Sequence, residues 1–171
     1  MALESHNEQG FVRGIMNIKI IAVGKIKEKF TKLAIEEYEK RLGAYCSLIL
    51  TEIPAQEIKD ENLAQKYMEA EAEKILAKIK PDSYVITLEI QGKSLSSVEF
   101  AQKLKNISAE GTNEVVFVIG GANGLAQSVS SRADFKLSFS KMTFTHQFAR
   151  VLLYEQIYRA FKINSNESYH R

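Results

Sequence analysis

Cysteine is almost absent from this chain of 171 residues, which holds only Cys46. One cysteine excludes an intrachain disulfide, and no Cys/His spacing resembles a zinc site. No apolar run approaches the length of a membrane span. We therefore expect a reducing cytoplasmic location, no metal, no membrane association, and a packing role for Cys46 rather than a nucleophilic one.

A strong overall charge is also lacking, because the formal net charge is only +2. Bulk charge therefore does not indicate nucleic-acid binding. Residues 132–171, however, hold seven Lys/Arg against three Asp/Glu. This surplus points to a polyanionic partner for the C-terminal quarter. Chance asymmetry over so short a stretch is an equally good explanation.

The sequence has no internal repeat, low-complexity run or linker, and its length fits one domain with a substantial core. We expect that domain to span residues 16–171. Residues 1–15 are mostly polar and have no apolar h-region, which excludes a secretory signal. Because Met16 opens a strand-like run, we interpret residues 1–15 as an upstream extension or a cloning remnant, disordered and outside the fold.

Strand and helix patterns alternate along the rest of the chain. The predicted strands cover 17–23, 48–53, 84–90, 115–119 and 135–139, with Gly92 closing the third. Helices are predicted over 28–42, 60–79 and 147–163, with a short one from residue 126. Another is predicted to end at about Lys105, with either Ser94 or Ser96 as its N-cap. This alternation predicts the α/β class: a parallel sheet flanked by helices on both faces.

The most informative segment is the apolar run Val115–Ile119, which is followed at once by the sequence G-G-A-N-G at 120–124. Glycine lets the backbone turn with positive φ and lets a ligand approach the main chain. Ligands of open α/β sheets bind beyond the carboxyl ends of strands. We therefore predict a small-molecule site here. The phosphate-loop pattern G-x-x-x-x-G-K-[ST] is missing, and the turn follows the fourth strand rather than the first.

A second loop, residues 139–146, follows the fifth strand and lies at the same edge of the sheet. Its Ser, Thr and Lys side chains offer polar contacts, and its Met and Phe side chains offer an apolar wall. This mixture suits an adenosine-like ligand. The alternative is an ordinary connection in which Thr145 or His146 caps the last helix.

The last predicted helix is apolar well beyond one stripe, with Phe148, Val151 and Leu152 among its apolar residues. A helix that is apolar on two sides is expected to be buried on two sides. We expect one side to meet the sheet and the other to meet a second copy of the chain. Arg150 and Glu155 are predicted to form a structural ion pair.

The chain ends in a polar tail, for which disorder is the default. Its last residues are Tyr169, His170 and Arg171. Tyrosine stacks on bases, histidine titrates near neutrality and arginine binds phosphate. These residue types suggest a functional tail, and structural irrelevance is the alternative.

Four segments together resemble one known family. They are M-N-I-K-I-I-A-V-G-K-I-K-E-K-F from Met16, V-F-V-I-G-G-A-N-G-L from Val116, L-S-F-S-K-M-T-F-T-H-Q-F-A-R-V-L-L-Y-E-Q-I-Y-R-A-F from Leu137, and the closing Y-H-R. They are similar to the RlmH-type methyltransferases of the SPOUT class, which modify large-subunit ribosomal RNA. The resemblance covers residues 16–171.

The resemblance implies a SPOUT-type fold with a C-terminal trefoil knot, and a homodimer that packs through the C-terminal helix. It implies S-adenosyl-L-methionine (SAM) as methyl donor. It also implies N3 of a pseudouridine in 23S rRNA as the acceptor, within the ribosome.

The resemblance also assigns site residues by position. Cofactor contacts fall on Leu88, Gly120, Phe139, Ser140, Lys141, Met142, Thr143 and Phe144. The tail would reach the RNA at the active site. There His170 is a candidate base or proton relay, Arg171 would stabilise developing charge or hold phosphate, and Tyr169 would stack on the target base.

Two rival functions follow from the same motifs. A nucleotide-dependent oxidoreductase would carry G-x-G-x-x-G after its first strand and an acidic residue about twenty positions later. The sequence has neither. The other rival is a non-catalytic ribosome-binding module of the same fold. The presence of both ligand loops and the tail argues against it.

Overall fold

The computed structural model describes residues 15–169. Apart from Ile15, the predicted extension at 1–15 lies outside the described residues, and so do His170 and Arg171.

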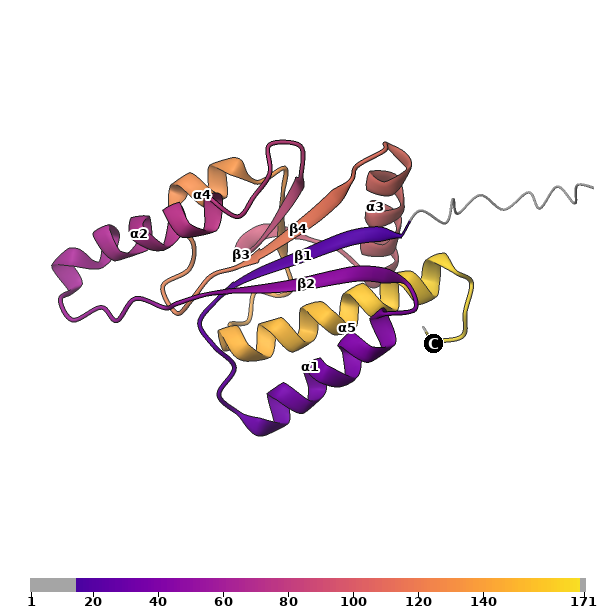
Figure 1. Ribbon diagram of the computed structural model, residues 1–171, viewed down its shortest axis with the longest axis horizontal. Helices are drawn as coiled ribbons and strands as arrows, with labels where there is room; N and C mark the ends of the chain where they lie inside the picture. The colour runs from indigo at the N-terminus through magenta and orange to yellow at the C-terminus, as the bar shows by residue number, and fades with distance from the viewer. Residues whose placement is uncertain (1–14, 170–171) are drawn as a thin grey trace, which may run out of the picture.

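Five parallel strands form one sheet in the order β2-β1-β4-β3-β5 (Figure 1). The strands are β1 (Met16–Val23), β2 (Cys46–Ile53), β3 (Tyr84–Ser94), β4 (Glu114–Ile119) and β5 (Phe135–Ser138). Along β4 every residue from Val115 to Ile119 is buried, alternately against the two faces. Such continuous burial is why this strand is an unbroken apolar run in the sequence.

Helices cover both faces of the sheet and complete three layers (Figure 1). One face carries α1 (Lys29–Leu42), α3 (Ser97–Ala109) and α5 (His146–Asn164), and the other carries α2 (Ala64–Leu76) and α4 (Gln127–Arg132). None of the helices within residues 15–169 is both long and apolar enough to cross a membrane. The predicted α/β class with a parallel, helix-flanked sheet is confirmed, and the trefoil knot stays a prediction.

Two local predictions need correction. The helix expected over 60–79 is a 3-10 turn at Glu61–Leu63 followed by the shorter α2. Gly92 does not close β3, because Leu88 and Lys93 both pair with Leu137 and the residues between them bulge out. A Cβ on Gly92 would lie 2.7 Å from the carbonyl oxygen of Lys136. This glycine therefore permits close approach to β5 rather than ending a strand.

Cys46 is buried in the core at the start of β2, as predicted for a packing residue. Burial raises the pKa of its thiol to about 12. The thiol therefore stays protonated at neutral pH, which is the form without nucleophilic reactivity.

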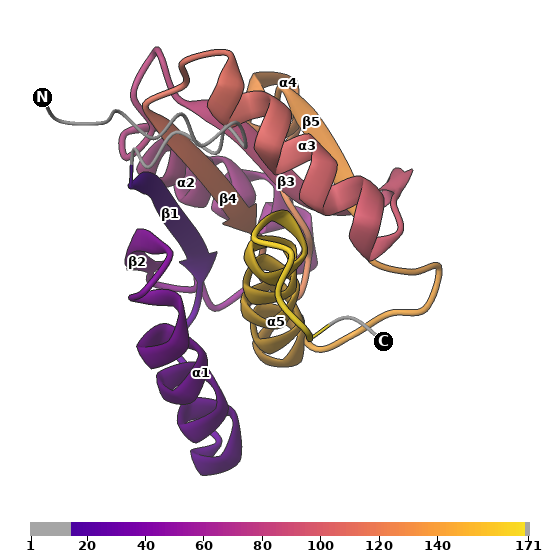
Figure 2. The same ribbon diagram turned by 90° about the vertical axis from the view of Figure 1, so that its right-hand side faces the viewer.

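Helix α5 runs antiparallel to the strands, between α1 and α3 (Figure 2). Its first turn lies at the carboxyl ends of the strands, where the side chain of Arg150 binds the carbonyl of Gly24. Its last turns lie at the amino ends, where Phe161 stacks on Tyr45. The flanking helices account for much of the apolar surface that had suggested a second copy of the chain.

Candidate functional site

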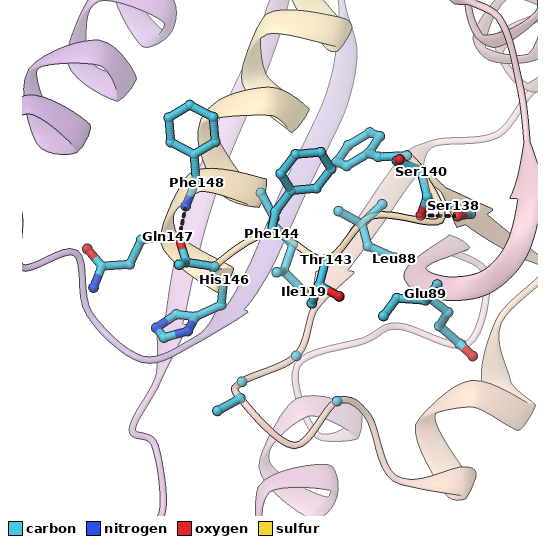
Figure 3. A pocket seen from close by; sticks show the side chains of 18 of the residues that line it. Leu88, Glu89, Ile119, Ser138, Ser140, Thr143, Phe144, His146, Gln147 and Phe148 are labelled. Carbon is cyan, nitrogen blue, oxygen red and sulfur yellow. Dashed lines mark hydrogen bonds between the residues drawn. The ribbon is translucent and has the colours of Figure 1, made fainter.

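A cavity of about 1100 Å³ lies between the bulge of β3, the ends of β4 and β5, and the start of α5 (Figure 3). This volume is at the upper end of the range for small-molecule and cofactor sites. Figure 3 shows Phe144 between Leu88 on one side and His146 on the other. The cavity thus occupies the edge of the sheet at which the sequence placed a ligand.

The glycine turn after β4 forms one wall. A Cβ on Gly120 would lie 2.8 Å from the backbone of Gly124, so no larger residue fits there without a shift of the main chain. Gly124 has φ +77°, and its N–H donates to the carbonyl of Gly121 at 3.1 Å. The turn therefore requires glycine at these positions for its own geometry.

The loop between β5 and α5 forms a second wall and is held by its own hydroxyl groups. The Ser138 hydroxyl donates to the carbonyl of Ser140 at 3.2 Å, and the Ser140 hydroxyl accepts from the N–H of Met142 at 2.9 Å. Thr145 caps α5 by accepting from the N–H of Phe148 at 3.2 Å. The predicted capping role and a place in the cavity wall are therefore compatible, because Thr145 has both.

The structure brings most of the predicted cofactor contacts together. The residues of that set that line the cavity are Leu88, Gly120, Phe139, Ser140, Met142, Thr143 and Phe144. Lys141 is exposed and is not among the lining residues. Side chains such as Leu88 and Phe144 supply apolar surface, and the two loops supply backbone N–H and carbonyl groups. This combination fits a ligand with one flat apolar face and several polar edges.

Three further segments line the cavity that the sequence analysis did not identify. They are the start of α1 with the residue before it, the bulge of β3, and the first turn of α5 beyond His146; their members include Glu28, Phe30, Glu89, Gln147 and Phe148. The segment before α1 follows the carboxyl end of β1. The rule that placed the glycine turn at this edge therefore applied to it equally.

Gln147 joins two of these segments. Its side-chain oxygen accepts from the N–H groups of Lys27 and Glu28, at 3.0 and 3.4 Å. The segment before α1 is thereby tied to the first turn of α5. Sequence patterns do not reveal such a contact, because the partners are separated by about 120 residues.

Glu89 lies in the bulge of β3, and its carboxylate is already engaged. The hydroxyl of Thr87 donates to one oxygen at 2.7 Å, and the hydroxyl of Ser130 donates to the other at 3.0 Å. Ser130 belongs to α4, so this carboxylate fastens the bulge to the opposite layer. Glu89 therefore shapes the wall of the cavity.

The predicted ion pair between Arg150 and Glu155 is wrong. Arg150 is fully buried, and it binds Glu52 at 3.3 Å and the carbonyl of Gly24 at 2.9 Å. Glu155 instead pairs with Arg159 at 2.6 Å. Five residues along a helix turn the side chain by about 140°, which directs Arg150 and Glu155 to different sides. Arg150 holds α5 against the ends of β1 and β2.

Tyr169 lies at the other end of α5 from the cavity and does not line it. Its ring packs edge-on against Tyr158, with centroids 4.9 Å apart, and the guanidinium of Arg159 lies 4.8 Å from its centroid. Burial raises the pKa of its hydroxyl to about 12. A helix of 19 residues is about 28 Å long, so the structure does not bring Tyr169 to the cavity of its own chain.

Within residues 15–169, no group of three or more His, Cys, Asp or Glu side chains is placed to hold a metal ion. The cavity offers apolar surface, backbone polar groups and the imidazole of His146. These are the properties of a site that binds and orients an organic cofactor.

Comparison with known proteins agrees with this geometry. A family model described as predicted SPOUT methyltransferase matches residues 16–170. Among solved structures, the chain is similar to a probable methylase family protein from Haemophilus influenzae Rd KW20, with a TM-score of 0.53. The two sequences are 18% identical, and the match covers 91% of this chain and 71% of the other. This likeness concerns the fold.

Proposed function

Because the chain belongs to the SPOUT methyltransferase family, we propose that it methylates N3 of a pseudouridine in 23S rRNA with SAM as the donor. Family membership makes it a methyltransferase. The cofactor and the nucleotide are the finer parts of the proposal. The observation that supports them best is that the bulge of β3 and the ends of β4 and β5 line one cavity, together with the glycine turn after β4.

The residues of the cavity fit the adenosyl part of SAM. Leu88, Phe139 and Phe144 offer apolar surface for the adenine ring, and Gly120 and Gly121 line the cavity without side chains, which favours approach of the cofactor to their main chain. When bound, the cofactor supplies a methyl group already activated by its sulfonium. The task of the protein is therefore to align that methyl group with the acceptor nitrogen and to exclude water.

The acceptor nitrogen must lose its N–H proton when its new bond to carbon forms. In this proposal His170 receives that proton, and Arg171 stabilises the negative charge that develops on the base. His146 is the imidazole that lines the cavity within the described residues. The His170→Ala and His146→Ala variants are compared at saturating SAM and ribosomes. Unchanged turnover in His170→Ala would remove that residue from the chemistry.

The position of Tyr169 bears on how the tail reaches RNA. It is anchored at the end of α5 away from the cavity, so a tail that acts at a cavity would act at the one in a second copy of the chain. We therefore retain the proposal of a homodimer through α5. The outer side of α5 carries Val151 and Leu152, half-buried, and Phe148, which is 45% exposed.

The dimer is tested by sedimentation. The wild type is expected at about twice 19.3 kDa, and Leu152→Glu is expected to reduce the mass toward that of one chain. Gln102→Glu, at an exposed position of α3, adds the same single negative charge outside α5. An active wild-type monomer would contradict the proposal of a dimer.

The central experiment combines binding with transfer. Calorimetry is expected to detect SAM and its demethylated product, and to detect no binding of NAD. Incubation with methyl-labelled SAM and ribosomes from cells that lack the modification is expected to label one pseudouridine of 23S rRNA. SAM binding without transfer to any ribosomal substrate would favour the non-catalytic, cytoplasmic ribosome-binding module instead.

A further inference from the structure

The segment that joins β1 to α1 concentrates positive charge. Residues 24–32 hold four lysines and one acidic residue, Glu28. The lysines, all exposed, are Lys25, Lys27, Lys29 and Lys32. No salt bridge joins any of them to another residue in the described range 15–169. We call residues 24–32 the lysine rim.

The basic C-terminal quarter differs in this respect. Of its six described Lys/Arg residues, four form salt bridges with acidic side chains, namely Arg132, Arg150, Arg159 and Lys162. Their charge is thus largely balanced within the chain. The surplus that the sequence assigned to the C-terminal quarter is therefore a poorer guide to a polyanionic partner than the lysine rim.

The lysine rim is held in a defined conformation. At its start, the Gly24 N–H donates to the carbonyl of Ile53 at 2.8 Å, and the Gly24 carbonyl accepts from buried Arg150. In its middle, the N–H groups of Lys27 and Glu28 donate to Gln147. A segment fixed in this way loses little additional freedom when it binds a ligand.

The lysine rim also borders the cavity. Glu28, Phe30 and Thr31 line it, and the four lysines are not among its lining residues. Phe30 is 63% exposed, although it is a large apolar side chain. Proteins bind single-stranded nucleic acid with two elements: positive side chains that contact its phosphate backbone, and exposed aromatic rings on which its bases stack.

We propose that the lysine rim binds single-stranded RNA next to the cavity. Lys25, Lys27 and Lys29 contact successive phosphates, and Phe30 stacks on a base that neighbours the target nucleotide. This inference rests on the proposed function, since it assumes that RNA is the substrate. It assigns to the amino-terminal part of the domain the electrostatic role that composition had suggested for the C-terminal quarter.

The test measures how RNA binding depends on salt. The probe is a fluorescein-labelled single-stranded RNA of about 16 nucleotides, followed by anisotropy from about 50 to 200 mM salt. For the triple variant Lys25→Ala/Lys27→Ala/Lys29→Ala, the negative slope of log affinity against log salt is expected to become smaller in magnitude by about 2, or about 0.7 for each lost phosphate contact.

The control removes the same charge elsewhere. Lys66→Ala/Lys74→Ala/Lys105→Ala changes three exposed lysines on α2 and α3 that do not line the cavity. Its slope is expected to equal that of the wild type. Equal slopes in the two triple variants would overturn the proposal. Loss of the dimer in the rim variant alone would also overturn it, and would assign the segment to an interface between copies.

Phe30→Ala separates stacking from charge. Its RNA affinity is expected to fall about tenfold with an unchanged slope, because stacking involves no counterion release. Unchanged affinity would remove Phe30 from the proposal. SAM titration is run on every variant. If SAM binds but the two triple variants show the same salt dependence of RNA affinity, the proposal for the lysine rim alone is refuted. If RNA binding depends on the rim but SAM does not bind, the proposed function alone is refuted.

Discussion

The two ends of α5 differ in how far their apolar side chains are exposed. At the end beside the cavity, Phe148 is 45% exposed and the nearby Met142 is 75% exposed. At the opposite end, Phe161 is 3% exposed and stacks on the ring of Tyr45. We call these the cavity end and the closed end. The same helix therefore leaves apolar side chains uncovered at one end and covers them at the other.

The polar contacts of the two ends differ as well. The cavity end depends on contacts to strand termini, through buried Arg150 and through Gln147. The closed end has charged pairs close to the surface, such as Lys162 with Glu167. Polar groups at the cavity end therefore fix backbone segments beside a site, and their loss is expected to affect stability and binding together.

The largest expected effect is that of Arg150→Ala at the cavity end. The change leaves the Gly24 carbonyl without its buried donor and empties the space of a large side chain, so the free energy of unfolding is expected to fall by about 3 kcal/mol. Arg159→Ala, toward the closed end, removes a partly exposed helical pair and is expected to lose about 1 kcal/mol or less. Urea denaturation measures both, and equal losses would contradict the distinction.

Gly120→Ala is expected to come next. Its Cβ would approach the backbone of Gly124 to 2.8 Å, which forces a shift of the turn and lowers stability by about 2 kcal/mol. SAM affinity is expected to fall as well. Gly43→Ala, near the closed end, has φ −57° and a nearest contact of 3.4 Å. It is expected to leave both quantities unchanged, and calorimetry with thermal unfolding decides.

Gln147→Ala is expected to have a smaller effect. It removes the side-chain oxygen that accepts from two exposed N–H groups, and water then takes the place of that acceptor. The free energy of unfolding is therefore expected to fall by only about 1 kcal/mol. RNA affinity is expected to fall too, since the lysine rim loses its tie to α5. Gln102→Ala, exposed on α3, is the control. A normal RNA affinity in Gln147→Ala would show that this tie does not position the rim.

The smallest expected effect is a pH dependence at the closed end. Hydrogen bonds from Lys162 and from Tyr45 lower the pKa of Glu167. A carboxyl whose pKa is lower in the folded state stabilises that state above the unfolded pKa of about 4.3, and this stabilisation is lost as pH falls through the folded pKa. Unfolding at pH 7 and pH 3 is expected to show a smaller difference in Glu167→Gln than in the wild type.

The sequence predicted the sheet well because parallel strands are buried on both faces and appear as apolar runs, as with Val115–Ile119. The sequence also predicted the edge of the sheet at which the cavity lies, because the carboxyl ends of parallel strands meet at the same edge. The sequence did not predict Glu52 as the partner of Arg150, because the two residues are 98 positions apart and no local sequence pattern pairs them. Gly92 was misjudged because a glycine that ends a strand and one that permits close approach look alike in a sequence.

The amide of Gln147 has a consequence for the order of events in a catalytic cycle. Its oxygen belongs to the first turn of α5, which lines the cavity, and accepts hydrogen bonds from the segment that we propose to bind RNA. Two binding events that both change this contact are linked, and linkage is mutual. If a ligand in the cavity changes the dissociation constant for RNA by some factor, bound RNA changes the dissociation constant for that ligand by the same factor.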